Sequence, residues 1–316
     1  MKSFAFVFPG QGSQSVGMMD AWDDHPVVAA TVAEASDALQ QDIGVLIRQG
    51  PKESLALTTN TQPVMLVAGV AAFRVWMAET GCVPSVVAGH SLGEYTALVA
   101  AGVLSLHDAA SLVRFRAEAM QQAVPIGSGA MAAIMGLDAE RVVAGCAEAS
   151  ACFGSESFEV VEAVNFNDPM QTVIAGSKLA VAKACEVLKA NGAKRALLLS
   201  VSAPFHSSLM KPAAEKLRQK LAGVTFSSPQ IPLINNVDVA VETDGQRIRD
   251  ALYRQAFGPV RWVECVSAIK SRGVFNIVEC GPGKVLAGLV KRIDPDLTSI
   301  PLFDPASNAV VKELLA

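Results

Sequence analysis

A serine between two glycines stands in a setting that is typical of a catalytic nucleophile. The segment GHSLG at residues 89–93 matches the pattern G-x-S-x-G. A short strand is predicted before it, over residues 85–88, and an apolar helix after it, over residues 94–101. Such a sharp turn lifts the serine oxygen above the sheet edge and directs backbone N–H groups at developing negative charge. We predict that Ser91 is a nucleophile; the simpler alternative is a tight helix-capping turn.

A serine hydroxyl is a weak nucleophile unless a base lies nearby. Among the four histidines, His25 and His107 lie at predicted helix starts, where surface exposure is the simpler explanation. The side chain of His90, next to the serine, is expected to point away from it. His206 lies in a loop after a predicted strand, at a junction where a cleft should form. We predict that His206 is the general base; a structural loop histidine is the alternative.

No acidic residue completes an obvious catalytic triad. Asp168 lies between Ser91 and His206 in the sequence, as the acid does in α/β hydrolases. It stands in the turn signal Asn167-Asp168-Pro169, which gives it a local role, so it is a weak candidate.

Two backbone N–H groups are candidates for an oxyanion hole. In serine acyl-transfer folds, one donor follows the nucleophile and the other comes from a loop after an early strand. The loop PGQG at residues 9–12 follows an apolar run at residues 4–8. Gln11 and Leu92 are therefore the matching residues. The loop does not match a dinucleotide-binding fingerprint, because Ser15 stands where a third glycine is needed.

Arg116 lies on the apolar side of a predicted helix over residues 106–122. Ala109, Val113 and Met120 share its face at helical spacing. A buried arginine is costly unless it is paired. One explanation is an internal salt bridge with an acid that the sequence does not identify. The other is bidentate binding of a substrate carboxylate, which would make the enzyme specific for an acyl group with a free acid.

The elements that position these residues alternate between strand and helix, which predicts an α/β fold with a mostly parallel sheet. The segment at residues 129–200 differs. It has the order β-α-β-β-α-β, which is the split motif of ferredoxin-like domains. We therefore predict a large α/β catalytic subdomain formed by residues 1–128 and 201–316, with a small subdomain inserted at residues 129–200.

Composition excludes several classes of protein. The 316 residues include 26 Lys+Arg and 30 Asp+Glu, a formal net charge of −4, so no nucleic-acid partner is expected. The longest uncharged apolar run, at residues 64–73, is far shorter than the about 18 residues of a membrane span. The six cysteines form no C-x-x-C pair and are interpreted as reduced thiols in a cytoplasmic protein, with no metal site.

These motifs together resemble those of the malonyl-CoA:acyl carrier protein transacylases of bacterial fatty acid synthesis. The resemblance covers nearly the whole chain. The matching segments are FVFPGQGSQ at 6–14, TQP at 61–63, GHSLGEY at 89–95, GAMAAI at 129–134, NFN at 165–167, FHSSLM at 205–210, NNVD at 235–238 and ECGPGKVL at 279–286, besides the helix of Arg116.

The resemblance implies a hydrolase-like core and a ping-pong transfer of malonyl from malonyl-CoA to the phosphopantetheine thiol of acyl carrier protein. Ser91 would be acylated and His206 its base, Gln11 and Leu92 would supply oxyanion N–H groups, and Arg116 would bind the malonyl carboxylate. The main-chain carbonyl of Gln255 would orient the histidine, which would explain the missing acid. No cofactor is implied, because the coenzyme A thioester is a substrate, and a monomer is expected.

Two departures from the family pattern stand out. Ala117 occupies a position that is usually glycine, and Phe205 one that is small in many free-standing members. Leu92 and Phe205 nevertheless resemble the malonyl-selecting versions of related polyketide acyltransferases. Two other functions remain open: a serine hydrolase or thioesterase, whose second acceptor is water, and a catalytically silent carrier-binding module.

Overall fold

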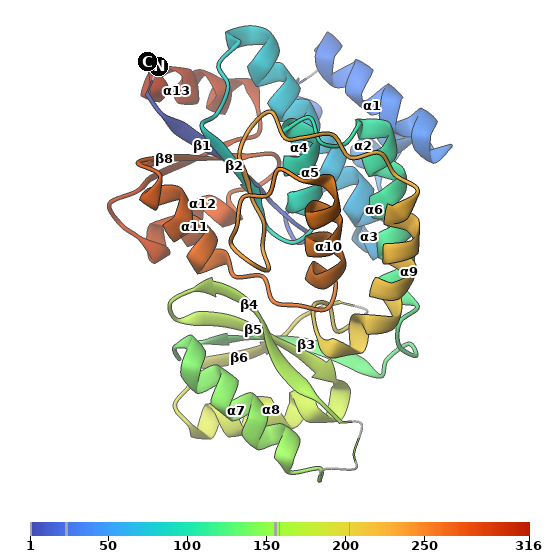
Figure 1. Cartoon of the computed structure of the whole chain (residues 1–316), viewed down its shortest axis with the longest axis vertical. Helices are drawn as coiled ribbons and strands as arrows, with labels where there is room; N and C mark the ends of the chain where they lie inside the picture. Colours follow the sequence, from blue (N-terminus) through green and yellow to red (C-terminus); the bar gives the residue numbers. More distant parts are fainter. Residues whose placement is uncertain (1, 23–24, 155–156, 158, 202) are drawn as a thin grey trace.

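The computed structural model describes residues 2–22, 25–154, 157, 159–201 and 203–316. They form a large α/β region, drawn in the upper part of Figure 1, and a smaller region with its own sheet below it. The two ends of the chain lie side by side, because Lys2 N donates a hydrogen bond to the carbonyl of Leu315 (2.7 Å).

The large region is built on a five-stranded sheet in which each paired strand is parallel to its neighbour. The order is β7-β2-β1-β8-β9. Its strands are β1 (Phe4–Phe8), β2 (Val86–Gly89), β7 (Leu233–Ile234), β8 (Asn276–Cys280) and β9 (Thr298–Leu302). The register pairs Phe8 with Gly89, so β1 and β2 end at the same sheet edge. The predicted oxyanion loop and the serine turn therefore leave the sheet together.

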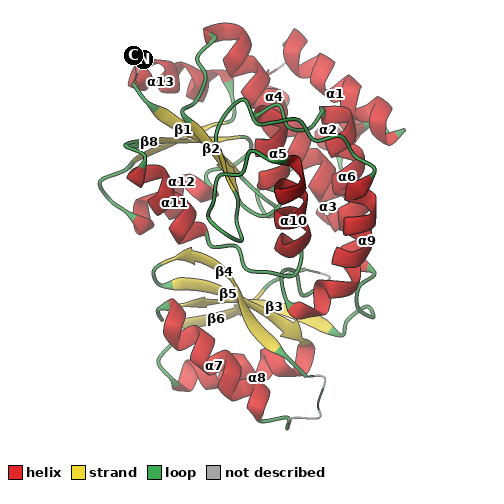
Figure 2. Cartoon of the chain, viewed as in Figure 1, coloured by secondary structure: helices red, strands yellow, loops and turns green. Residues whose placement is uncertain are grey.

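Helices cover both faces of this sheet (Figure 2). Phe4, Phe6 and Phe8 pack on the side of α4, while Ala5 and Val7 contact a second core with α11 and α12. The helices of the large region are α1 (Pro26–Leu39), α2 (Ile43–Gln49), α3 (Lys52–Ala56), α4 (Thr58–Thr80), α5 (Gly93–Ala100), α6 (Leu106–Gln121), α9 (Lys211–Ala222), α10 (Gly245–Gln255), α11 (Trp262–Ser271), α12 (Val285–Ile293) and α13 (Pro305–Leu315), with short 3-10 turns at Asp20–Trp22 and Ser208–Met210. The predicted α/β class with a mostly parallel sheet is confirmed.

Helix α4 extends beyond the apolar run at residues 64–73 at both ends. It is long and apolar enough to span a membrane by length and composition, yet 78% of its most apolar window is buried inside the protein. Phe6 and Trp76, for example, pack edge to face with ring centroids 5.6 Å apart. The apolar surface of α4 is therefore core surface.

The smaller region is a four-stranded antiparallel sheet with two helices on one face. Its elements are β3 (Gly129–Met135), α7 (Ala139–Ala151), β4 (Val161–Asp168), β5 (Gln171–Ser177), α8 (Lys178–Ala190) and β6 (Arg195–Leu198). The sheet order β4-β5-β3-β6 and the chain order are those of a ferredoxin-like fold. Residues that alternate along the strands, such as Ala132 and Ile134, pack with α7 and α8 in a core of their own.

The two regions are joined by specific bonds next to β4. Val260, in the large region, accepts from Phe166 N (3.0 Å) and donates to the carbonyl of Val164 (2.8 Å). Arg292 Nε of α12 pairs with Asp168 Oδ2 at 2.7 Å. These bonds attach the edge strand β4 of the small sheet to the large region.

Candidate active site

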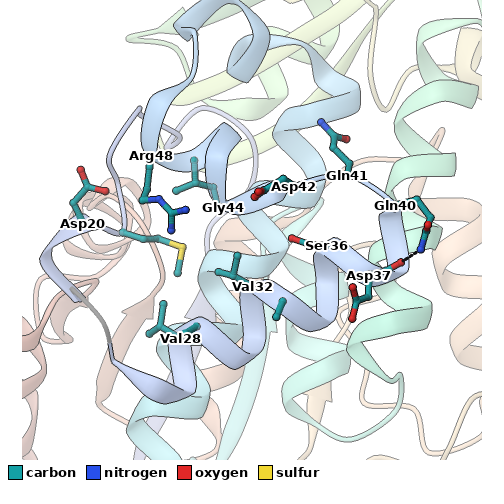
Figure 3. A pocket seen from close by; sticks show the side chains of 14 residues that line it. Asp20, Val28, Val32, Ser36, Asp37, Gln40, Gln41, Asp42, Gly44 and Arg48 are labelled. Atoms are coloured by element: carbon teal, nitrogen blue, oxygen red, sulfur yellow. Dashed lines mark hydrogen bonds between the residues drawn. The ribbon is translucent and has the colours of Figure 1, made fainter.

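A pocket of about 210 Å³ lies between the two regions and collects most of the predicted site residues. Its walls are formed by Gln11, Gln62, His90, Ser91, Leu92, Arg116, Met131, Asn165, Asn167, Val173, Leu199, Val201, Phe205 and His206. A larger hollow of about 790 Å³ lies between α1 and α2 (Figure 3). Its lining includes Asp20, Asp37 and Arg48 but none of the predicted site residues.

Ser91 occupies a strained turn between β2 and α5. Its φ of 53° lies in the left-handed region that L-residues rarely adopt. The two flanking glycines are required by close packing: a Cβ on Gly89 would lie 1.9 Å from the Gly93 carbonyl carbon, and one on Gly93 would lie 2.0 Å from the Phe8 oxygen. Asn236 braces the turn, because its Oδ1 accepts from Ser91 N (2.8 Å) and its Nδ2 donates to the Gly89 carbonyl (2.7 Å).

His206 faces the serine hydroxyl. Its Nε2 lies 2.7 Å from Ser91 Oγ, and its Nδ1 lies 2.8 Å from the main-chain oxygen of Gln255. A carbonyl oxygen only accepts, so the proton is on Nδ1 and Nε2 is free to accept the serine proton. A main-chain carbonyl of Gln255 thus stands where a triad acid usually does.

Burial and a nearby cation keep His206 neutral. The imidazole is almost completely buried. Burial, with a smaller contribution from the Arg116 charge, lowers the pKa of His206 to about 3, because both disfavour the imidazolium. At neutral pH the ring is therefore in the form that accepts a proton.

Gln11 and Leu92 both line the pocket beside the serine. Leu92 begins the turn into α5, and Gln11 lies in the loop after β1, which leaves the same sheet edge. Among the described residues, neither backbone N–H donates to a protein acceptor. Both groups are thus available to a ligand oxygen in the pocket.

Arg116 lies on α6, and its buried side chain reaches the hydroxyl of Ser91. Its Nη2 donates to Ser91 Oγ (3.3 Å) and to Gln255 Oε1 (3.1 Å), and its Nη1 donates to Gln62 Oε1 (2.9 Å). All three acceptors are neutral. None of the ion pairs among the described residues includes Arg116. The internal salt bridge that the sequence left open is therefore not formed there.

Two other residues have structural contacts away from the serine. Asp168 pairs with Arg292 and accepts from Met170 N, so it does not act as a triad acid for His206. His90 Nε2 bonds to Asn167 Oδ1 (2.8 Å) across the two regions. The ring nitrogen that could face the pocket is thus engaged by Asn167, and the bond to the Ser91 hydroxyl is made by His206.

Sequence reasoning gave no role to three polar side chains around this site. Gln62 lies in the TQP segment, Glu94 directly follows GHSLG, and Asn236 lies in NNVD. All three are at most 3% exposed. Buried amides and carboxylates need hydrogen-bond partners. The position of these three residues inside the quoted motifs is the feature of the sequence that could have pointed to them. The departures are also accommodated, since Ala117 is fully buried on α6 and Phe205 lines the pocket.

The arrangement supports covalent acyl transfer. It supplies a nucleophile, a neutral base in the required tautomer, two unengaged N–H groups and a cation beside the attacking oxygen. Such a set takes an acyl group from a thioester or ester onto serine and passes it to a second acceptor.

Comparison with known proteins gives the same assignment. Residues 5–295 match the acyl transferase domain family. The chain is 52% identical to a malonyl CoA-acyl carrier protein transacylase of Escherichia coli K12 over 315 residues, 99% of this chain and 100% of that protein. An acyl-carrier-protein S-malonyltransferase from Burkholderia pseudomallei superposes with a TM-score of 0.95 at 63% identity, covering 99% of this chain and 100% of that one. A malonyl-transacylase solved with a type II PKS acyl-carrier protein has a TM-score of 0.95 at 50% identity, with coverages of 99% and 100%. The chain belongs to the malonyl CoA-acyl carrier protein transacylase family of acyl transferases.

Proposed function

We propose that the protein transfers malonyl from malonyl-CoA to the phosphopantetheine thiol of acyl carrier protein, for fatty acid biosynthesis. The observation that carries the proposal is the position of Arg116. Its buried guanidinium has no carboxylate partner among the described residues and lies 3.3 Å from the Ser91 oxygen. A three-carbon diacid on that oxygen places its free carboxylate within reach of the guanidinium fork.

In the first half-reaction Ser91 Oγ attacks the thioester carbonyl carbon while His206 Nε2 takes the hydroxyl proton. The carbonyl oxygen becomes an oxyanion held by the N–H groups of Gln11 and Leu92. The C–S bond then breaks, and the imidazolium returns its proton to the departing sulfur. The products are malonyl-serine and coenzyme A. The Gln255 carbonyl, 2.8 Å from Nδ1, holds the ring in place through both proton transfers.

The second half-reaction reverses these steps with a new thiol. The phosphopantetheine thiol of the carrier gives its proton to His206 Nε2 and attacks the ester carbon. The C–O bond to Ser91 breaks, and the serine oxygen recovers the proton. Arg116 holds the malonyl carboxylate in both halves, so the acyl group stays oriented while its thiol partners exchange.

We propose the following setting for this reaction: a monomer in the cytoplasm that needs no cofactor, with coenzyme A present only as part of the substrate. The net charge of −4 and the buried apolar α4 support a protein that acts away from nucleic acid and membrane. Light scattering on a size-exclusion column should give about the 33.0 kDa of one chain. Dialysis against a chelator should leave the transfer rate unchanged; a loss restored by a metal would contradict this setting.

Intact-mass spectrometry after mixing with malonyl-CoA tests the reaction directly. A stable gain of one malonyl group, discharged on addition of holo acyl carrier protein with gain of the same mass by the carrier, is the expected result. Rapid release of free malonate without the carrier would indicate a hydrolase instead. No gain of mass would indicate a silent binding module.

The matched control is Ser91→Ala. The turn depends on Gly89 and Gly93 rather than on the hydroxyl, so the variant should fold and remain unlabelled. Labelling at the wild-type rate would place the nucleophile elsewhere.

A further inference from the structure

We propose that Gln62 determines acyl specificity by holding Arg116 with an uncharged oxygen, so that the cation keeps its full attraction for the carboxylate of the acyl group. The inference rests on the proposed function and deepens it. Gln62 is 2% exposed, lines the pocket, and accepts from Arg116 Nη1 at 2.9 Å.

A second amide completes this neutral support on the other side of the guanidinium. Gln255 Oε1 accepts from Arg116 Nη2 (3.1 Å), while its Nε2 donates to Glu94 Oε2 (3.0 Å) and to the Ser91 carbonyl (3.0 Å). The Gln255 amide therefore stands between Arg116 and the carboxyl group of Glu94. In addition, burial raises the pKa of Glu94 to about 7, which weakens its negative charge near neutral pH.

The identity of the groups that support Arg116 matters, because a protein carboxylate there would pair with the guanidinium as strongly as the substrate carboxylate does. A carboxylate adds the attraction of an opposite charge and can bind the guanidinium through two parallel hydrogen bonds, which a neutral amide oxygen cannot do. An internal carboxylate at position 62 would satisfy Arg116 in the free enzyme, and malonyl would then have to displace it. The amide oxygens of Gln62 and Gln255 orient the Arg116 guanidinium without competing with the substrate carboxylate for it. An acetyl group, which has no carboxylate, gains nothing from either arrangement.

Gln62→Glu is the sharpest test, because it changes charge at almost constant shape. The adjacent cation favours the ionised form of the new carboxyl group. The ratio of kcat/KM for malonyl-CoA to that for acetyl-CoA should fall by about thirtyfold or more, as when one side of a buried charge pair is lost. Gln255 is less suitable for this test, since a second carboxylate there would face Glu94.

Gln62→Met is the matched neutral variant. It removes the hydrogen bond to Arg116 without adding a competing charge. Because that bond is made whichever acyl group is bound, its loss largely cancels in the malonyl-to-acetyl ratio, which should stay within about tenfold of wild type. An unchanged ratio in Gln62→Glu would overturn the proposal. So would a fall in Gln62→Met as large as that in Gln62→Glu, because Gln62 would then act through shape alone. If Gln62→Glu does not fold, Gln62→Met decides alone: a fall of more than about tenfold in the malonyl-to-acetyl ratio would overturn the proposal.

Two further measurements separate this proposal from the one it rests on. Labelling of Ser91 by an uncharged fluorophosphonate should proceed in both variants, which shows that the nucleophile is intact. Wild-type enzyme with no preference for malonyl over acetyl would refute the proposed function itself, whatever the variants do.

Discussion

The parallel sheet and the inserted antiparallel sheet face one pocket but bring different chemistry to it. Every group with a proposed part in bond making comes from the large region. The insert contributes side chains that carry no charge at neutral pH: Met131, Asn165, Asn167, Val173 and Leu199. The comparison indicates that the large region supplies the reacting groups, while the insert forms an uncharged wall that shapes the pocket and excludes water from it.

The two sheets also differ in how they are buried. Strands β1 and β2 are covered on both faces and are entirely buried. The small sheet packs on α7 and α8 with one face, and its edge strand β6 is largely exposed. The Ser91 turn follows the buried strand β2 and packs against the end of the buried strand β1, so it resists displacement, which suits a nucleophile that must keep a strained φ.

The largest effect should come from His206→Ala in the large region. General acid–base catalysis contributes about 10²–10⁴-fold, and both half-reactions should slow together because one base serves both. Met131→Ala, in the insert wall, should lose less than about tenfold, since it removes contact area and no reacting group. Rapid-quench measurement of acylation and of transfer checks both variants. A loss under tenfold for His206→Ala, or equal losses for the two variants, would contradict the proposal that the large region alone supplies the reacting groups.

Next come glycine substitutions that compare the rigidity of the two regions. Gly93→Ala should cost about 3 kcal/mol or more, because its Cβ meets the Phe8 backbone oxygen, which cannot move away. Gly145→Ala, in α7, should cost about 1 kcal/mol or less. Its Cβ meets the Leu188 side chain, which can rotate, and alanine favours the helix. Urea denaturation gives both values; similar costs would contradict the comparison.

Hydrogen exchange on the same variants tests the predicted division of the chain. If residues 129–200 form a subdomain of their own, Gly145→Ala should alter exchange mainly within that range. An even change across both ranges would refute the division.

The smallest change is expected in the pH dependence of Ser91 acylation, which should be flat. Because the pKa of His206 is lowered to about 3, the base is neutral throughout the range from pH 5 to pH 8. The rate of Ser91 acylation should therefore stay flat as the pH falls through 6.5, where a free histidine would become charged. Single-turnover acylation at a series of pH values checks this. Burial also raises the pKa of Glu94 to about 7, so the same series is measured in Glu94→Gln. An acid limb centred near 6.5 that persists in this variant would show that His206 becomes charged like an exposed histidine.

Much of this arrangement was predictable because it is local. The strand at residues 4–8, the glycine-bounded turn of Ser91 and the inward face of the Arg116 helix follow from patterns of a few residues. The β-α-β-β-α-β order is also a local sequence of signals, and the structure confirms the ferredoxin-like fold that it predicted.

The supporting contacts were not predictable in the same way. Gln62 and Gln255 meet at Arg116 although they are 193 positions apart, and Asn236 braces a turn 145 positions away. Amide side chains carry no periodicity that would reveal such partners. The start of α4 was hidden for a related reason: the residues before the apolar run, Thr58–Gln62, are polar, and Pro63 lies inside the helix.

The central claim is that Arg116 binds the carboxylate of the transferred acyl group, and kcat/KM for malonyl-CoA and acetyl-CoA in Arg116→Ala tests it most directly. Removing one side of a buried charge pair costs about 2–5 kcal/mol, which is about thirtyfold to several thousandfold for malonyl. Acetyl should lose much less, so the preference should flatten or invert. Arg116→Lys should rescue malonyl only in part, because an ammonium cannot form the fork. Equal losses for malonyl and acetyl would contradict the account and leave Arg116 as a structural residue.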